Sequence, residues 1–355
     1  MEITVLDTNF FKVDVIDVFN SLIWTDRYSI WGDFDFKKEA SIEIANSLRE
    51  DYYLQLKESE HTMIIETITL KTDIEEGNQF IARGRSLESI LDRRIIWNQT
   101  TLNGSLQDGI KKLLNENAII PSDANRKISN LIFETSTDPN VTSLSVDEQF
   151  RGENLYDVIS GLCTNSGIGF KITLNSDNKF VFKLYAGTDR SYDQVSNPHV
   201  VFSPNFDNLS NTNYNHSKIP YKTVTLVGGE GEGSARKTYQ VILSGGETEL
   251  NRREIFTDAR DISSLVGGVT ISDAEYNTLL ANRGLLNLIE NSQSSSFEGK
   301  VDPTTTYLYG THFFMGDIVQ IENEYGIQGK SRITELIISQ DLSGSDIFPT
   351  FEMIE

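Results

Sequence analysis

The sequence contains very little cysteine: Cys163 is the only one among 355 residues. A single cysteine excludes an intramolecular disulfide and a metal site made from several cysteines. Cys163 follows apolar residues at helical spacing, and no histidine stands near it in the sequence. We therefore expect a small buried side chain and not a catalytic nucleophile.

Histidine is also scarce, and the chain has only His61, His199, His216 and His312. No two of them stand three or four residues apart, the spacing that places two metal ligands on one helix face. No serine stands in the strand–turn–helix motif of a nucleophile elbow. A triad of residues distant in sequence stays open, but the sequence predicts no catalytic, cofactor-binding or metal-binding residue.

Basic residues are few, since 31 Lys and Arg stand against 52 Asp and Glu, which gives a formal net charge of -21 at pH 7. Stable binding to DNA or RNA needs basic residues that displace counterions from the phosphates. Anionic membrane surfaces attract basic segments in the same way. The sequence has no basic block, so we expect neither stable nucleic-acid binding nor membrane binding.

Long apolar runs are absent as well, and none approaches the ~18 residues of a transmembrane helix. The start of the chain, Met1 to Thr4, lacks the basic and apolar parts of a signal peptide. We expect the protein to be made in a reducing cytoplasm, and to stay soluble or to leave by another route.

The residues that are present indicate an ordered, β-rich chain. Hydrophobic residues make up 38% and charged residues 23% of the sequence, which argues against extensive disorder. The length suggests two or three domains at roughly 150 residues each. Short segments that alternate apolar and polar residues predict strands at 3–6, 13–17, 21–28, 31–36, 40–44, 52–56, 63–72 and 79–84, with a turn at 75–78. Many short strands with regular turns favour a closed or nearly closed barrel.

The periodicity changes at Ser86, which we expect to be the N-cap of a helix that includes Leu87, Ile90, Leu91 and Ile95. The following segment, 97–200, is predicted to be one inserted α/β unit. Its expected elements are helices at 106–114 and 155–163, a strand at 130–134, and a hairpin of strands 170–174 and 179–184.

The last part of the sequence returns to strands. Strands are predicted at 200–203, 223–227, 238–243, 295–299, 306–309 and 348–351, and the Asn- and Ser-rich stretch 208–216 is typical of a turn region. A capping box at Ser272 and Glu275 predicts the start of a helix over 272–290. The clearest hairpin joins 313–321 to 331–339, where Gly316 and Asp317 allow a sharp turn into the first strand.

Two further motifs are tempting but weak. The glycine-rich loop 228–238 lacks a glycine before its lysine and continues as a strand, so we interpret it as a hairpin loop and not as a phosphate-binding loop. The acidic stretch Asp189–Asp193 could hold calcium, but it contains Arg190 and has no matching ligand pattern.

Four stretches together resemble a known family. They are the strand at 21–28 followed by Gly32 to Phe34, the segment 80–94, the helix start Tyr156 to Ile159 with its trailing hairpin, and the closing hairpin at 316–319 and 332–335. In order and spacing they resemble the baseplate hub proteins of long-tailed phages, the siphophage tail-associated-lysin N-terminal domain or prophage endopeptidase tail family.

The resemblance implies a β-rich α+β fold with two β-barrel hub domains, an inserted α/β domain and additional helices. The implied domains are a first barrel at 1–92, completed by 200–228, the insert at 93–199, and a second barrel at 229–355. It also implies a homotrimeric ring at the tail tip of the virion, with a distal tail protein, a tail tube or tape measure protein and a receptor-binding protein as partners.

Family members with a lysin or fibre region carry it after the hub, and we expect this chain, which stops at Glu355, to lack it. The resemblance therefore predicts a structural protein and no enzyme. Two alternatives come from other classes: a tail-associated cell-wall hydrolase acting through carboxylates brought together by the fold, and a carbohydrate-binding module that stacks sugars on Trp24, Trp31 or Trp97.

Overall fold

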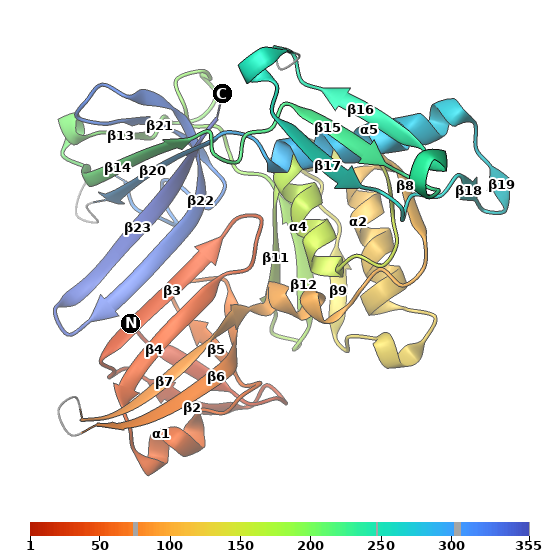
Figure 1. The fold of residues 1–355 in the computed structure, drawn as a ribbon. Helices are drawn as coiled ribbons and strands as arrows, with labels where there is room; N and C mark the ends of the chain where they lie inside the picture. Colours follow the sequence, from red (N-terminus) through yellow and green to blue (C-terminus); the bar gives the residue numbers. More distant parts are fainter. Residues whose placement is uncertain (74–76, 246–247, 302–306, 355) are drawn as a thin grey trace.

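The computed structural model shows a β-rich α+β fold of several sheets with few helices, which confirms the predicted class (Figure 1). The structure describes residues 1–73, 77–245, 248–301 and 307–354. No helix within these ranges has both the length and the apolar character needed to cross a bilayer.

The first β region comes from the amino-terminal part of the chain. In its strands apolar side chains alternate between the two faces: Leu22 and Trp24 are fully buried, whereas Ile23 is exposed. The elements are β1 (Ile3–Leu6), β2 (Lys12–Ile16), β3 (Ser21–Arg27), β4 (Asp33–Glu39), α1 (Ile42–Ser47), β5 (Tyr53–Leu56), β6 (Thr62–Asp73), β7 (Gly77–Ser86) and the 3-10 helix η1 (Leu87–Arg93).

The inserted α/β unit follows. Asn154 caps its helix α4 by accepting from the backbone N–H groups of Tyr156 and Asp157, and Gly167 ends it at a φ of +68°. The elements are β8 (Thr100–Ser105), α2 (Leu106–Leu114), η2 (Asn115–Ile119), η3 (Ala124–Arg126), β9 (Leu131–Glu134), α3 (Pro139–Thr142), β10 (Ser145–Phe150), α4 (Leu155–Asn165), β11 (Gly169–Leu174) and β12 (Phe180–Tyr185).

The carboxyl-terminal part contains a helix that starts with the predicted capping box at Ser272 and Glu275. Its elements are β13 (Val201–Phe202), η4 (Pro204–Phe206), β14 (Leu209–Ser217), β15 (Val224–Gly228), η5 (Gly233–Ala235), β16 (Thr238–Ile242), η6 (Glu249–Asn251), β17 (Glu254–Asp258), β18 (Leu265–Val266), β19 (Val269–Thr270), α5 (Asp273–Glu290), β20 (Ser294–Val301), β21 (Ile318–Glu322), β22 (Gln328–Asp341) and β23 (Gly344–Met353).

One large sheet joins the two ends of the chain (Figure 1). Its strand order is β14-β20-β23-β22-β3-β4-β7-β6-β5-β1-β2, with β13 and β21 attached beside β22. The central link is the antiparallel pair of β3 and β22, in which Trp24 lies opposite Ile338. Among the described strands this order is open, with β14 and β2 at its ends, so the pairings do not close two separate barrels.

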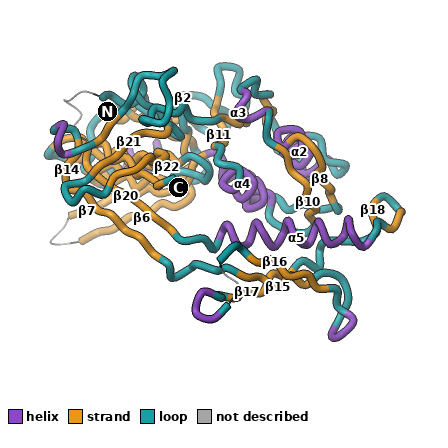
Figure 2. The backbone as a smooth tube through the Cα atoms, turned by 90° about the horizontal axis from the view of Figure 1, so that it is seen from above, coloured by secondary structure: helices purple, strands orange, loops and turns teal. Residues whose placement is uncertain are grey.

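Three hydrophobic cores follow this arrangement. The main core combines both ends of the chain and contains Trp24, Phe36, Phe202, Phe297 and Phe351. The core of the inserted unit is drawn from residues 64–184. A small third core lies where α5 packs on the β16-β15-β17 sheet, and Figure 2 shows α5 between that sheet and α4.

Two sequence predictions are wrong. The segment predicted as a strand at 40–44 begins helix α1, because the Ser41 side chain accepts a hydrogen bond from the Ile44 backbone N–H and caps the helix. The segment predicted as a turn region at 208–216 is the strand β14, which pairs antiparallel with β20. At the edge of the sheet, polar side chains of β14 can face solvent, so this strand lacks an apolar pattern.

Other predictions hold in part. The helix predicted after Ser86 is the 3-10 helix η1, and Ser86 does not cap it with its side chain. Ser86 Oγ instead accepts from the Gly32 backbone N–H at 2.7 Å. Residues 75 and 76 of the predicted turn and residue 306 of the predicted strand at 306–309 lie outside the described residues, and Tyr309 forms only an isolated bridge to Phe313.

The domain division stays a prediction, but the pairings of residues 200–228 are informative. The strands β13 and β14 pair with β21 and β20 of the carboxyl-terminal part. The strand β15 belongs to the separate three-stranded sheet with β16 and β17. These strands therefore do not pair with the strands of the first β region that we expected them to complete.

Tyr28 lies at the point where the three parts meet. Its side chain is 2% exposed, its hydroxyl accepts from the Gly187 N–H at 3.3 Å, and its carbonyl accepts from the Phe170 N–H at 3.1 Å. The Arg332 guanidinium lies 5.3 Å from the ring centre. A Cβ on Gly187 would overlap the backbone at Gly316, which itself has a φ of +88°. The joint therefore requires glycine for close packing.

We predict that Gly187→Ala lowers the free energy of unfolding by about 1–3 kcal/mol, because the added methyl group overlaps the backbone of another segment. Chemical denaturation at neutral pH measures this effect. The matched control is Gly161→Ala in α4, where a Cβ would meet only Glu290 Oε1 at 3.6 Å. That variant should be neutral or more stable by up to about 1 kcal/mol. Equal effects of the two substitutions would refute the close-packing argument.

Candidate functional site

A cleft of about 450 Å³ opens where the first β region, the inserted unit and the segment before β21 meet. Such a junction between parts of a chain is a common place for a ligand or catalytic site. The lining residues come from all three parts: Asp26, residues 57–61, Lys171, residues 185–188, Tyr309, Gly310, Phe314, Met315 and Asp317.

A buried ion cluster lies beside this cleft, and two of its members, Asp26 and His61, line it. Asp26, His61 and Glu88 are 2%, 6% and 0% exposed. His61 Nδ1 lies 3.3 Å from Glu88 Oε1, which is an ion-pair distance although the pair lacks hydrogen-bond geometry. Trp24 Nε1 donates to Asp26 Oδ1 at 3.0 Å, and the Ser59 hydroxyl donates to Asp26 Oδ2 at 2.7 Å.

The two carboxylates keep His61 charged. Burial alone would lower the pKa of His61, but the charges of Asp26 and Glu88 outweigh it and raise that pKa to about 9. Burial raises the pKa of Asp26, with His61 acting against it. Burial also acts to raise the pKa of Glu88, but His61 and hydrogen bonds bring it below its usual value. The cluster therefore holds an imidazolium at neutral pH.

The cluster also fastens the inserted unit to the first β region. The Ile172 backbone N–H of β11 donates to Glu88 Oε1 at 2.6 Å. The neighbouring Lys171 forms an ion pair with Glu60, and the hydrogen bond from Lys171 lowers the pKa of Glu60. The Lys171 ammonium also lies 4.9 Å from the centre of the Tyr185 ring.

A second ion pair fastens the inserted unit to the carboxyl-terminal strands. Arg190 Nε lies 2.7 Å from Asp317 Oδ2, and the Thr188 N–H donates to Asp317 Oδ1 at 2.7 Å. Asp317 is 2% exposed. The residue that turns the chain into the predicted closing hairpin thus also binds the end of the inserted unit.

Ser59 and His61 do not make the side-chain contact of a serine-hydrolase triad. In a serine hydrolase the serine hydroxyl hydrogen-bonds the histidine, but the Ser59 hydroxyl donates to Asp26 and accepts from the His61 backbone N–H. The described residues include no group of three or more His, Cys, Asp and Glu suited to a metal ion. The contacts of the cluster are those of a joint that holds three segments in place.

The residues singled out in the sequence lie apart. Cys163 is fully buried, and burial raises the pKa of its thiol far above the usual value. His199 hydrogen-bonds the Gln194 carbonyl at 2.9 Å. His216 bonds Ser295 Oγ at 2.7 Å, and the ring of His312 accepts from the Leu308 N–H at 2.9 Å. Of the four histidines, only His61 is in the cluster.

Of the three tryptophans, only Trp97 is largely exposed. Trp24 is fully buried. Trp31 stacks on Tyr156 with ring centres 3.9 Å apart, and the Arg85 guanidinium lies 4.5 Å from the Trp31 ring centre. Trp97 is 61% exposed, with the Arg126 guanidinium 5.1 Å from its ring centre.

The glycine-rich loop 228–238 and the acidic stretch 189–193 both have structural roles. The loop 228–238 joins the antiparallel strands β15 and β16, so the predicted hairpin loop is confirmed. Within it, Arg236 donates to the Gly228 carbonyl at 2.7 Å and to Asp258 at 2.6 Å. In the stretch 189–193, Asp189 accepts from the Ser191 N–H, and Asp193 forms an ion pair with Lys330 at 3.1 Å.

The ion cluster was not predicted from the sequence, although two residues carry a signal for it. Asp26 continues the inward series of Leu22 and Trp24 along a predicted strand, which places a carboxylate inside the sheet. Glu88 lies between Leu87 and Ile90 in a segment whose residues 87–91 are all buried. Buried acids require a partner, but nothing in the sequence identifies His61 as that partner.

We predict that charged His61 stabilises the fold in a pH-dependent way. Because its pKa is raised from 6.5 to about 9 on folding, its contribution is fully present below pH 6.5 and is lost as the pH rises through about 9. The difference in unfolding free energy between the wild type and His61→Gln should therefore shrink by on the order of 3 kcal/mol over this range. Urea denaturation at a series of pH values measures the difference.

Glu88→Gln provides the companion variant, because it removes one of the two charges that raise the pKa of His61. In Glu88→Gln the loss of stability with rising pH should be complete at a lower pH than in the wild type. Parallel stability profiles for the wild type and His61→Gln would contradict the charged cluster.

Several solved structures of bacterial prophage tail proteins are similar to this fold. The 43 kDa tail protein of prophage MuSo2 from Shewanella oneidensis has a TM-score of 0.58 at 13% identity, with 100% of this chain and 98% of that one covered. The tail protein from Neisseria meningitidis MC58 also has a TM-score of 0.58 at 13% identity, with coverages of 99% and 95%. Prophage tail protein gp18 from Listeria monocytogenes EGD-e has a TM-score of 0.52 at 14% identity, with coverages of 99% and 94%.

These similarities establish a shared fold with prophage tail proteins. No curated protein sequence matches the chain significantly. The family described as siphovirus ReqiPepy6 Gp37-like protein matches residues 2–351. Together, the family and the fold confirm the resemblance to siphophage tail proteins. Because the match spans nearly the whole sequence, the chain belongs to the siphovirus ReqiPepy6 Gp37-like family.

Proposed function

We propose that the chain is a structural baseplate hub protein of a long-tailed phage or a related prophage or tailocin. In this proposal three copies form a ring at the tail tip. The ring links the distal tail protein and the tail tube above to receptor-binding or needle components below, and it gates the passage of DNA.

The observation that carries the proposal is the joining of both chain ends into one sheet through β3 and β22. This sheet forms a continuous scaffold, and the inserted unit is fastened beside it by the ion cluster and by the Arg190–Asp317 pair. A continuous scaffold held together by buried contacts suits a part that transmits position and force. The family and the prophage tail folds support the same assignment.

The two β regions would be the hub domains of the ring. We propose that residues 1–92 form the first, that 93–199 form the insert, and that the second includes the strands from 294 onward. The pairing of β13 and β14 with β21 and β20 adds residues 201–217 to the second region. In the sequence, the small α/β layer of β15 to β17 and α5 then interrupts the second hub region, between residues 217 and 294.

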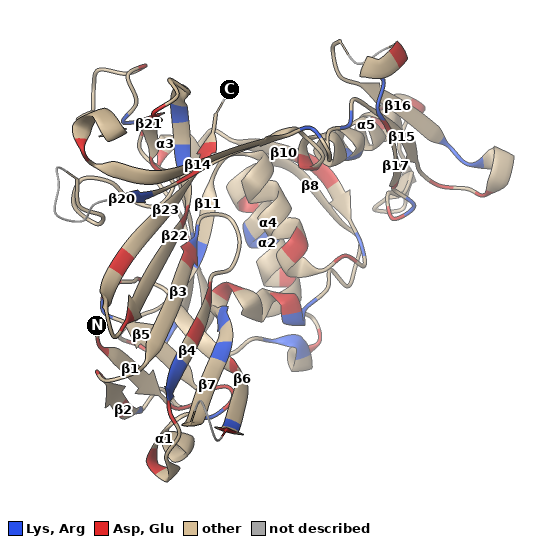
Figure 3. Cartoon of the chain, turned by 60° about the vertical axis from the view of Figure 1, so that its left-hand side comes forward, with Lys and Arg blue, Asp and Glu red and all other residues tan. Residues whose placement is uncertain are grey.

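The charge of the chain suits a conduit for DNA. The formal net charge is -21, and Figure 3 shows acidic residues on strands of the first β region as well as on helices and loops of the inserted unit. Like charges repel a passing phosphate backbone, so a ring with this composition would not retain DNA.

The rival functions have less support. The hydrolase alternative gains no exposed acid–base pair from the ion cluster, because Asp26, His61 and Glu88 are buried and His61 is paired with Glu88. The carbohydrate-binding alternative relies on three tryptophans. Trp24 is buried and Trp31 is covered by Tyr156 and Arg85, which leaves Trp97 as the one largely exposed ring.

We predict a trimer in solution or on assembly into tails. The chain has a mass of 40.0 kDa, so light scattering across a concentration range should give about 120 kDa for a closed ring of three copies. A protein that stays monomeric at every concentration and is also monomeric in assembled tails would refute the hub proposal.

A cell-wall assay separates the hub from the hydrolase. We expect no clearing band when the purified protein is tested by zymography against Gram-positive cell walls. A clearing band that disappears in Glu88→Gln but persists in the exposed-site variant Glu50→Gln would favour the enzyme.

A further inference from the structure

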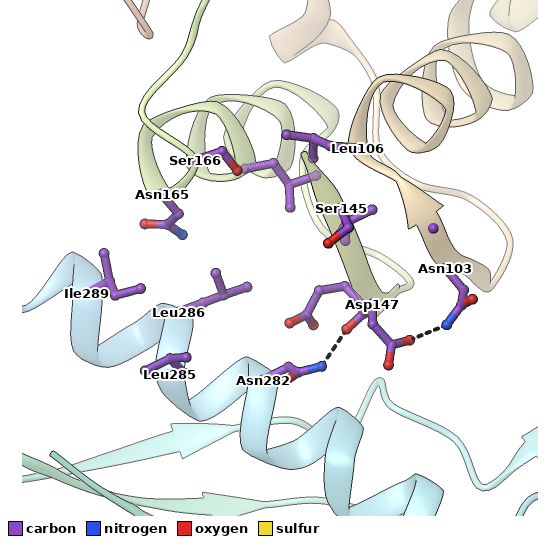
Figure 4. A pocket seen from close by; sticks show the side chains of 14 residues that line it. Asn103, Leu106, Ser145, Asp147, Asn165, Ser166, Asn282, Leu285, Leu286 and Ile289 are labelled. Carbon is purple, nitrogen blue, oxygen red and sulfur yellow. Dashed lines mark hydrogen bonds between the residues drawn. The ribbon is translucent and has the colours of Figure 1, made fainter. Parts of the chain in front are cut away.

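A groove of about 500 Å³ runs between β10, the end of α4 and the face of α5 that is turned away from the β16-β15-β17 sheet (Figure 4). The apolar side chains of Leu285, Leu286 and Ile289 line its α5 side. Leu285 is 43% exposed and Ile289 is 39% exposed. A second hollow of similar volume shares Leu162, Asn165 and Leu286 with the first. The contact between α4 and α5 is therefore flanked by open space on both sides.

Side chains of α5 hold the helix against the open edge of β10. Asn282 Nδ2 donates to the Asp147 carbonyl at 2.8 Å, as Figure 4 shows. Arg283 Nη2 donates to the Gln149 carbonyl at 2.6 Å, and its two terminal nitrogens lie 3.1 and 2.9 Å from the two carboxylate oxygens of Asp261. These bonds fix the position of α5, and the groove between α5, β10 and α4 stays unfilled.

Three buried acceptor atoms in the two hollows have no hydrogen-bond partner among the described residues. They are Glu148 Oε2, Asn165 Oδ1 and Asn287 Oδ1. Glu148 is only 3% exposed, and its Oε2 lies 3.9 Å from Arg283 Nε, too far for a hydrogen bond. Within the described ranges, Arg283 Nε is itself a buried donor without a hydrogen-bond partner. Buried polar groups in native proteins are normally satisfied, and one unpaired donor cannot satisfy all three acceptors, so further donors are missing.

The charges around Glu148 favour a cationic donor. Asp147, Glu153 and Asp261 all act on it, and Arg283 is the cation that faces it. Arg283 already binds Asp261 with two nitrogens. Burial and these acids, against the pull of Arg283, raise the pKa of Glu148 to about 8. Burial and Asp261 likewise raise the pKa of Glu153 to about 7. The acidic groups around Glu148 thus outnumber the one arginine that faces it.

From these contacts we infer that the groove between β10, α4 and α5 is a docking site for a segment of a neighbouring protein that inserts an arginine toward Glu148 and rests apolar side chains on Leu285 and Ile289. A guanidinium carries five donors and no acceptor, which matches a set of unsatisfied acceptors. The inference goes beyond the hub proposal, and binding to this groove can be measured whether or not the chain forms a trimer.

The test uses the acetylated and amidated tripeptide Leu-Arg-Leu and its analogue with citrulline in place of arginine. Citrulline keeps the shape of arginine and removes its charge. Ligand-observed NMR titrations with the full chain give the dissociation constants. We expect the arginine peptide to bind at least about tenfold more tightly than the citrulline peptide, because charge-assisted hydrogen bonds to a buried carboxylate are strong.

The variant Glu148→Gln should abolish this preference, while the variant Leu285→Ser, at an exposed position, should weaken both peptides equally. The matched control Glu50→Gln removes one negative charge from an exposed site in the first β region and should bind like the wild type. Circular dichroism of each variant checks that it is folded. Binding of the arginine peptide should also strengthen from pH 6 to pH 9, because the cation binds the ionised form of Glu148.

Three results would overturn the inference. The first is the absence of binding by either peptide to the wild type. The second is equal affinity for the arginine and citrulline peptides. The third is an arginine preference that Glu148→Gln leaves intact while Leu285→Ser has no effect, which would place the binding elsewhere on the chain.

Discussion

The antiparallel pairing of β3 with β22 is the constraint on which the rest of the structure depends. It aligns Arg27 to Ser21 with Glu335 to Asp341, and the ion pair between Arg27 and Glu335 connects residues 308 positions apart. Because the main core draws side chains from both β regions, neither region can bury its apolar face without the other. The sheet, its core and the position of the inserted unit all follow from this one pairing.

Polar contacts specify where the inserted unit lies. Asp26, His61 and Glu88 form one buried joint, and Arg190 forms another with the buried Asp317. Buried ion pairs add little net stability compared with apolar packing, but removing one partner is costly. These ion pairs therefore disfavour any other position of the inserted unit, because such a position would leave a buried charge without its partner. The glycines around Tyr28 act similarly, because only residues without a Cβ fit there.

Local signals predicted much of this fold from sequence. Helical spacing located α2 and α4, the capping box located the start of α5, and the closing hairpin has the predicted antiparallel pairing. Sequence patterns failed where pairing with a distant strand decides the structure. The strand β14 has polar residues and is a strand because β20 pairs with it. The strands β8, β10 and β17 escaped prediction for the same reason. The ion cluster was harder to predict than the fold, because its His61–Glu88 contact joins two segments whose proximity no local sequence pattern indicates.

The core of the inserted unit, which also includes residues of the first β region, has a consequence for synthesis. Its buried residues lie between positions 64 and 184, so this unit can condense while the ribosome is still making the rest. The strand β3 must wait for β22, whose paired residue Glu335 follows Arg27 by 308 positions. At translation rates of roughly 5–20 residues per second, that delay is on the order of 15 to 60 s. During this time β3 is an exposed apolar strand edge, the kind of nascent segment that chaperones bind.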